Sequence, residues 1–233
     1  MAVLSKGLPR ARSSAGYPQV LTALQDLLKG GTQSAIRNAD LALKKDNNLA
    51  LAYAIRGAAY SEFEDSQKVA ADLNKAIALD PALAGLFLYD LRRRANSDLQ
   101  NWPAALADTD KTIAISPKEA WRYRERGEIF AALHKIDLAV QDFTRSVQLE
   151  PKNYQVYKQR GDLYSHIGRY KEALADYNES LKLCPTDAMA YGCRADCYEK
   201  LGQPELAKKD RATCNKKGFN SMDAEGLGQI LGK

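Results

Sequence analysis

The sequence predicts an all-α solenoid, a stack of antiparallel helix pairs, and two regularities of the chain support this fold. First, one set of residue types recurs at a fixed step, and its tyrosines, 34 residues apart, are Tyr89, Tyr123, Tyr157 and Tyr191. Second, each interval contains two apolar stretches with helical spacing, separated by a turn signal. Such a period is typical of stacked units that bury their apolar faces only against their neighbours.

Residues 154–187 show the repeating unit most clearly. Two stretches carry apolar and aromatic side chains at helical spacing; Gly168 ends the first stretch and Pro185 follows the second. Both residues are typical helix terminators, so the unit is predicted to be two helices joined by a short turn. Gly161, inside the first helix, offers a point without a side chain where the two backbones can approach closely.

This order of aromatic, glycine, tyrosine, glycine, alanine, aromatic and proline resembles the tetratricopeptide repeat. The resemblance covers nearly the whole chain and implies a right-handed α-solenoid of six repeats. We place the repeats at 16–49, 50–83, 86–119, 120–153, 154–187 and 188–221. Residues 1–15 are expected to form a disordered N-terminal tail, and residues 222–233 a short C-terminal tail or partial cap.

Arginine and aspartate keep the same period and form a second series. An arginine on the first helix precedes an aspartate on the second helix by 16 residues in five of the repeats: Arg56/Asp72, Arg92/Asp108, Arg126/Asp142, Arg160/Asp176 and Arg194/Asp210. The first repeat lacks both partners and has Thr22 and Asn38 instead. We expect ion pairs that tie the two helices of a unit together or bridge adjacent units, which makes these arginines poor candidates for ligand contact.

Repeat three departs from the pattern. Two extra residues precede it, Arg93 stands where other repeats have a small residue, and Asn96 replaces an aromatic residue. An arginine at a close-packing position is expected to separate the helices or to shift them locally. Two interpretations remain open: a bend in the solenoid without functional meaning, or a basic binding site formed by Arg92, Arg93 and Arg94.

In tetratricopeptide proteins the first helices line a concave groove, so the resemblance assigns a set of candidate partner-binding residues. They are Phe87, Asp90, Arg94, Trp121, Arg124, Glu128, Gln155, Lys158, Asp162 and His166. Trp121 is the candidate anchor for an apolar group, and its basic neighbours suit a peptide with acidic residues. Alternatively, Trp121 seals the junction after Pro117, and Arg124 pairs with Glu128 along its own helix.

Several functional classes lack support in the sequence. The asparagines of the carboxylate clamp, which holds chaperone C-termini in some members of this family, are missing. Two histidines at non-ligand spacing and the lack of a nucleophile motif predict no catalysis, no metal and no cofactor. The net charge of +5 is small, and acids interrupt the basic stretches, which does not favour nucleic-acid binding. We also expect no membrane span. The four cysteines are expected to be free thiols, which predicts a cytoplasmic location for the protein.

We therefore predict a non-catalytic scaffold or adaptor that mediates protein–protein interaction and binds a peptide segment in the groove. The alternative is a self-assembling repeat protein that forms homo-oligomers through its C-terminal end, where only a short segment remains to cover the last repeat. The sequence does not identify the partner.

Overall fold

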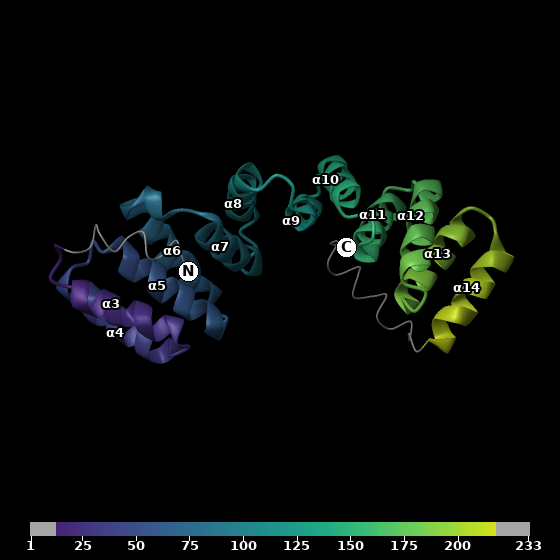
Figure 1. Cartoon of the computed structure of the whole chain (residues 1–233). Helices are drawn as coiled ribbons and strands as arrows, with labels where there is room; N and C mark the ends of the chain where they lie inside the picture. Colours follow the sequence, from purple (N-terminus) through teal and green to yellow (C-terminus); the bar gives the residue numbers. More distant parts are fainter. Residues whose placement is uncertain (1–12, 218–233) are drawn as a thin grey trace. The chain divides into compact units, whose positions relative to one another are not determined.

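The computed structural model describes residues 13–217 (Figure 1). Within them, twelve α-helices and two short 3₁₀ turns alternate with loops, and no strand occurs. The chain divides after Pro117 into two compact units. The fold is an all-α repeat solenoid, as predicted. Residues 1–12 of the expected N-terminal tail, and all of the expected C-terminal tail, lie outside the described residues.

The first unit, up to Pro117, contains three helix pairs, one within each of the first three repeat positions. Its helices are α3 (Tyr17–Leu28), α4 (Thr32–Lys45), α5 (Ala50–Tyr60), α6 (Ser66–Leu79), α7 (Leu86–Asp98) and α8 (Trp102–Ile115). One apolar cluster runs through α3 to α7, with Val20, Ile55 and Leu88 fully enclosed. Each helix pair thus buries its apolar face against the next pair, which is how a solenoid is stabilised.

The second unit begins at Lys118 and also contains three helix pairs. Its helices are α9 (Ala120–Ala132), α10 (Ile136–Leu149), α11 (Tyr154–His166), α12 (Tyr170–Leu183), α13 (Ala188–Lys200) and α14 (Pro204–Lys216). Its apolar side chains form two clusters, one around Phe143 and Val156 and another around Tyr177 and Cys197. In both units we call the odd-numbered helices the first helices and the even-numbered ones the second helices.

Glycines inside the first helices allow the two helices of a pair to approach closely. A Cβ atom on Gly127 would lie 2.8 Å from Cε1 of Phe143, and one on Gly161 would lie 3.0 Å from Cε1 of Tyr177. Carbon–carbon contacts are optimal at about 3.5–4.0 Å, so a side chain at either position would require the aromatic ring of the second helix to shift. Glycine opposite the ring avoids this shift.

The predicted arginine–aspartate pairs are all present, and each is a bidentate ion pair between the two helices of a unit. In repeat five, Nε and Nη2 of Arg160 donate to the carboxylate of Asp176 at 2.8 Å and 2.7 Å. The aspartates are buried, and a tyrosine ring three residues before each arginine lies 5.3–5.9 Å from its guanidinium carbon. We call this series of tyrosine, arginine and aspartate the arginine ladder.

Within each unit, ladder arginines also reach the second helix of the preceding repeat. Their Nη1 groups donate to a polar side chain there: Arg56 to Asp40, Arg92 to Asn74, Arg160 to Thr144 and Arg194 to Asn178, at 2.6–3.0 Å. One side chain thus joins the helices of its own repeat and bridges two repeats, so both arrangements that the sequence left open occur together.

Repeat one, which lacks the ladder pair, links its helices in another way. Asn38 of α4 donates to the carboxylate of Asp26 on α3 at 2.9 Å. Just before α3, the hydroxyl of Ser14 donates to Asp46 at 2.7 Å, and residues 13–15 form a turn. Residues 13–15 belong to the segment expected to form a disordered tail, and this contact joins Ser14 to the residue that ends α4.

Repeat three accommodates Arg93 through a small residue on the opposite helix. The repeat register places Arg93 opposite Thr109, at the position of Leu73, Phe143 or Tyr177 in the other repeats. Thr109 is fully buried, and its hydroxyl donates to the carbonyl of Ala105 at 2.8 Å. In repeat three the large side chain is therefore on the first helix and the small one on the second, the reverse of repeats two, four and five. This exchange provides space for Arg93, which was not expected from the sequence.

Candidate functional site

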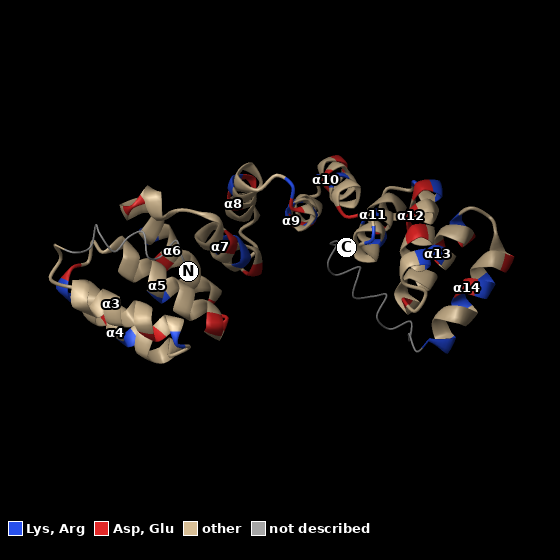
Figure 2. Ribbon diagram, in the orientation of Figure 1, with Lys and Arg blue, Asp and Glu red and all other residues tan. Residues whose placement is uncertain are grey.

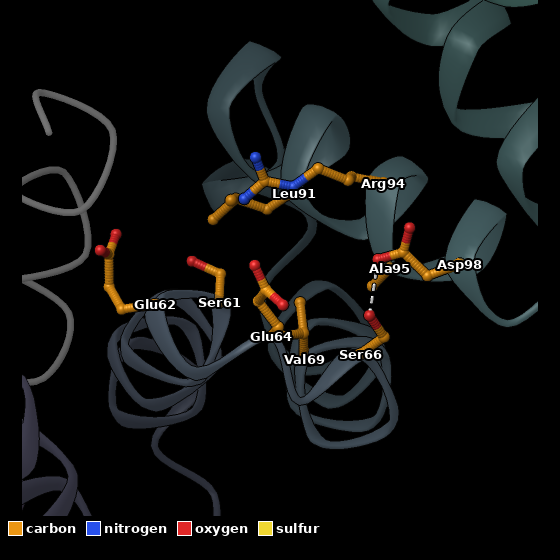
Figure 3. A pocket seen from close by; sticks show the side chains of 9 residues that line it. All are labelled: Ser61, Glu62, Glu64, Ser66, Val69, Leu91, Arg94, Ala95 and Asp98. Carbon is orange, nitrogen blue, oxygen red and sulfur yellow. Dashed lines mark hydrogen bonds between the residues drawn. The ribbon is translucent and has the colours of Figure 1, made fainter.

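A pocket of about 700 Å³ lies in the first unit, between the turn that follows α5 and the first helix α7 (Figure 3). The α5 side contributes residues of the 3₁₀ turn Ser61–Phe63 and the start of α6, and α7 forms the opposite wall. Its lining residues are Ser61, Glu62, Glu64, Ser66, Val69, Leu91, Arg94, Ala95 and Asp98. The volume lies within the range of ordinary ligand pockets.

Small side chains leave this space open. Ala95 of α7 stands at the repeat position that Ile129 holds in α9 and Leu163 holds in α11. Ser61 and Ser66 line the other side. In the second unit the larger side chains at the repeat position of Ala95, those of Ile129 and Leu163, are buried and take part in packing. The pocket therefore results from the irregular sequence of repeat three together with the short residues around the turn.

The pocket contains charged groups that the rest of the described chain does not neutralise. Arg94, Glu62 and Glu64 are exposed, and residues 13–217 offer none of them an ion pair or a side-chain hydrogen bond. Asp98 accepts a hydrogen bond from the hydroxyl of Ser66 at 2.7 Å, which joins α7 to the start of α6. Figure 3 shows the Arg94 side chain extending over the pocket, with Glu64 on the opposite side. These charges are available to a ligand.

The three consecutive arginines of repeat three do not gather into one basic site. Arg92 belongs to the arginine ladder through Asp108, at 2.6 Å and 2.9 Å, and Arg93 is half-buried opposite the small residue of α8. Only Arg94 lines the pocket. Of the other candidates on this helix, Phe87 packs against the apolar core, which removes most of its ring from a groove surface.

In the second unit, a strip of polar side chains runs across α9, α11 and α13. It contains four candidate residues, Arg124, Glu128, Lys158 and Asp162. Arg124 donates to Glu128 at 2.8 Å, and the amide of Gln159 donates to the same carboxylate at 2.8 Å. Lys158 lies 3.9 Å from a carboxylate oxygen of Asp187 and 3.4 Å from the sulfur of Met189. The pairing of Arg124 and Glu128 along one helix is the alternative that the sequence left open.

Asp162 is the most unusual group of this strip. The hydroxyl of Tyr177, itself fully buried, donates to Asp162 at 2.7 Å. Burial raises the pKa of the Asp162 carboxyl, while Tyr177 and Lys158 act in the opposite direction. The other candidates on this helix, Gln155 and His166, are exposed. A ligand on this strip would have to exchange existing hydrogen bonds, whereas the pocket beside Arg94 offers unused groups.

Trp121 is held by its own sequence neighbours at the start of α9. Its indole N–H donates to Glu119 at 3.2 Å, and the guanidinium carbon of Arg122 lies 4.1 Å from the centre of its ring. The ring is half-buried. Its position is therefore defined by local contacts, and part of its surface stays accessible.

Titratable groups elsewhere give no metal or thiolate centre in the described part of the chain. No group of three His, Cys, Asp or Glu side chains there lies close enough to hold a metal ion. All four cysteines are free, and burial raises the pKa of Cys193, Cys197 and Cys214. None of helices α3 to α14 has the length and apolar character needed to cross a membrane. Basic and acidic residues are interspersed over the helices of both units (Figure 2).

Sequence reasoning identified one wall of the pocket but missed the other. Arg94 was a candidate, and Ser61, Glu62 and Glu64 were not. A signal was available, because two acids stand at the turn of repeat two where repeat four has Ala132 and His134. Only the structure shows that this turn and α7 enclose a common space.

The architecture defines the class of the protein as a helical repeat protein, and comparisons of sequence identify the repeat. The sequence pattern of the tetratricopeptide repeat matches residues 154–187, the bounds predicted for repeat five, and a second match covers residues 176–209. Residues 154–209 therefore carry the tetratricopeptide repeat, within a chain of repeated helix pairs. No curated protein is found to match it in sequence.

Solved structures with the same fold include two tetratricopeptide-repeat proteins. YrrB, described as a TPR protein with an unusual peptide-binding site, aligns with a TM-score of 0.69 and 18% identity, over 80% of this chain and 95% of its own. MamA aligns with a TM-score of 0.65 and 17% identity, over 74% of this chain and 96% of its own. Identities this low support the fold alone.

Proposed function

We propose that the chain is a non-catalytic adaptor whose first helices bind an extended segment of a partner protein. The observation that carries this proposal is the pocket beside α7, where Arg94 and two carboxylates lack partners among residues 13–217. Unused charges next to an apolar wall are typical of a recognition surface. The peptide-binding site named for YrrB agrees with such a role for this fold.

The candidate residues divide between the two units. In the first unit, Arg94 is the principal contact, with Asp90 and the edge of Phe87 as neighbours. In the second unit, the polar strip and its surroundings would take part: Trp121, Arg124, Glu128, Gln155, Lys158, Asp162 and His166. We further propose a cytoplasmic location, since four free thiols suit a reducing compartment.

Self-association through the C-terminal end is the other candidate, and the described part of the last repeat does not favour it. Arg211 of α14 stands at the repeat position of Phe143 and Tyr177, which pack between helices. It pairs instead with Asp196 and Glu199 of α13, at 2.8 Å and 2.9 Å, and all three side chains are about half exposed. A polar surface of this kind does not need to be covered by a second copy.

The test is affinity capture from a native lysate, with bound proteins identified by mass spectrometry. Two variants probe the first helices, Arg94→Glu in the first unit and Trp121→Ala in the second. Two charge reversals at exposed positions of second helices, Lys75→Glu and Lys208→Glu, serve as controls, and circular dichroism verifies that all four are folded. A protein retained by the controls but lost from either groove variant supports the proposal. Equal recovery by all variants overturns it.

A further inference from the structure

The pocket beside Arg94 has a negative lining in a chain of positive net charge. Three carboxylates, from Glu62, Glu64 and Asp98, face one guanidinium, whereas the whole chain carries +5. Glu62 and Glu64 have no ion pair within residues 13–217. A cleft lined mainly by one sign of charge, next to low-dielectric walls, attracts ligand groups of the opposite sign.

Packing of the solenoid does not require these acids. At the positions of Glu62 and Glu64, repeat four has alanine and histidine, and repeat five has histidine and glycine: Ala132, His134, His166 and Gly168. Glu64 also has a φ of 55°, in the left-handed region where Gly168 and Gly202 stand in later repeats. An exposed carboxylate without an ion pair, at a position better suited to glycine, contributes little to the fold and is free to accept hydrogen bonds from a ligand.

The rest of the lining suits the stem of a long basic side chain. Leu91 is partly exposed, and Val69 and Ala95, only 2% and 3% exposed, form the apolar base of the pocket between the turn and α7 (Figure 3). Lysine and arginine bury their methylene groups along such surface while the charged end reaches polar groups. A pocket of about 700 Å³ has room for one such side chain and part of the backbone that carries it.

We propose that this pocket binds a lysine or arginine side chain of the partner segment, with Glu62 and Glu64 accepting hydrogen bonds from its charged group. The inference rests on the proposed function, because it names the residue type that the adaptor recognises at this place. Arg94, on the α7 side, donates to backbone carbonyls of the same segment. The chemistry differs from the acidic partner that the basic groove residues suggest from sequence.

The experiment is a titration of the ¹⁵N-labelled full chain with three capped pentapeptides of glycine and serine. Their central residue is lysine, its uncharged analogue norleucine, or glutamate. We expect the lysine peptide to shift the amide signals of residues 61–69 and 91–98, and to bind at least fivefold more tightly than the norleucine peptide. The variant Glu64→Gly removes one acceptor and relaxes the backbone, so it is expected to weaken lysine-peptide binding at least fivefold while the chain stays folded.

Gln100→Gly is the matched control, because Gln100 has the same left-handed backbone, with a φ of 55°, one repeat further on. It is expected to leave lysine-peptide binding unchanged. The proposal is overturned when the norleucine or glutamate peptide binds as tightly as the lysine peptide, when no peptide shifts these signals, or when Glu64→Gly binds as well as the native chain. Should the lysate partner still be captured in such a case, the chemistry of the pocket is wrong and the adaptor function stands.

Discussion

Removal of one arginine from the ladder should destabilise the second unit far more than removal of an exposed arginine. In Arg160→Met the carboxylate of Asp176, only 5% exposed, loses two hydrogen bonds and its counter-charge. Breaking a buried pair in this way costs about 3–5 kcal/mol, and we expect the lower end because 15% of the Arg160 side chain is exposed. Thr144 also loses its partner at 2.9 Å.

Arg169→Met is the control, since Arg169 pairs with Glu172 at 2.8 Å while both side chains are 44–49% exposed. An exposed pair contributes less than about 1 kcal/mol. Urea unfolding followed by circular dichroism gives the total change, and hydrogen exchange of α11 and α12 locates it. The double variant Arg160→Met/Asp176→Leu should recover most of the loss, because no buried charge remains. Equal effects of the two single variants would refute the assignment of the ladder as a buried, stabilising link between helices.

Three further changes test other features of the fold. Gly161→Ala should destabilise by about 1–3 kcal/mol because its Cβ meets Tyr177, whereas Gly192→Ala, whose Cβ meets only the sulfur of Cys214 at 3.5 Å, should stabilise by about 0.5–1 kcal/mol. Gln100→Gly and His134→Gly, at φ of 55° and 56°, should each stabilise by about 0.5–1 kcal/mol in thermal unfolding; a loss would contradict the left-handed assignment. Since burial raises the folded-state pKa of Asp162, its ionised form costs stability near neutral pH, so Asp162→Asn should stabilise at pH 7, with a difference that shrinks as the pH falls to 4. A difference independent of pH would exclude this cause.

The periodic features of the fold could be predicted because each is repeated along the sequence. The step of 34 residues defined the helix pairs, and the joint occurrence of arginine and aspartate predicted the ion pairs between them. What periodicity does not contain is compensation at single positions. Arg93 was expected to disturb repeat three, yet Thr109 on the facing helix leaves the space that it needs. The exchange is recognised only when the residues at the positions of Arg93 and Thr109 are compared together across the repeats.

The candidate site was harder to predict for the same reason. Consensus groove positions identified Arg94, but they also identified Phe87, which packs on the core, and Arg124, which pairs with Glu128. Whether a groove side chain is free depends on neighbours in other helices, and a pattern of positions does not contain those distances. Glu64 lines the pocket from the turn between α5 and α6, and the consensus groove positions include no residue of that turn.

The arginine ladder makes successive repeats chemically interchangeable in the second unit. Each ladder arginine pairs with a carboxylate of its own repeat and contacts only one side-chain oxygen of the preceding repeat. This oxygen belongs to Thr144 for Arg160 and to Asn178 for Arg194. Excision of residues 154–187 would therefore bring Arg194 against Thr144 and leave its pairing with Asp210 intact. Duplication or deletion of a whole repeat of 34 residues would therefore keep the contacts between neighbouring repeats. The number of repeats can change in this way without any other substitution at the junction.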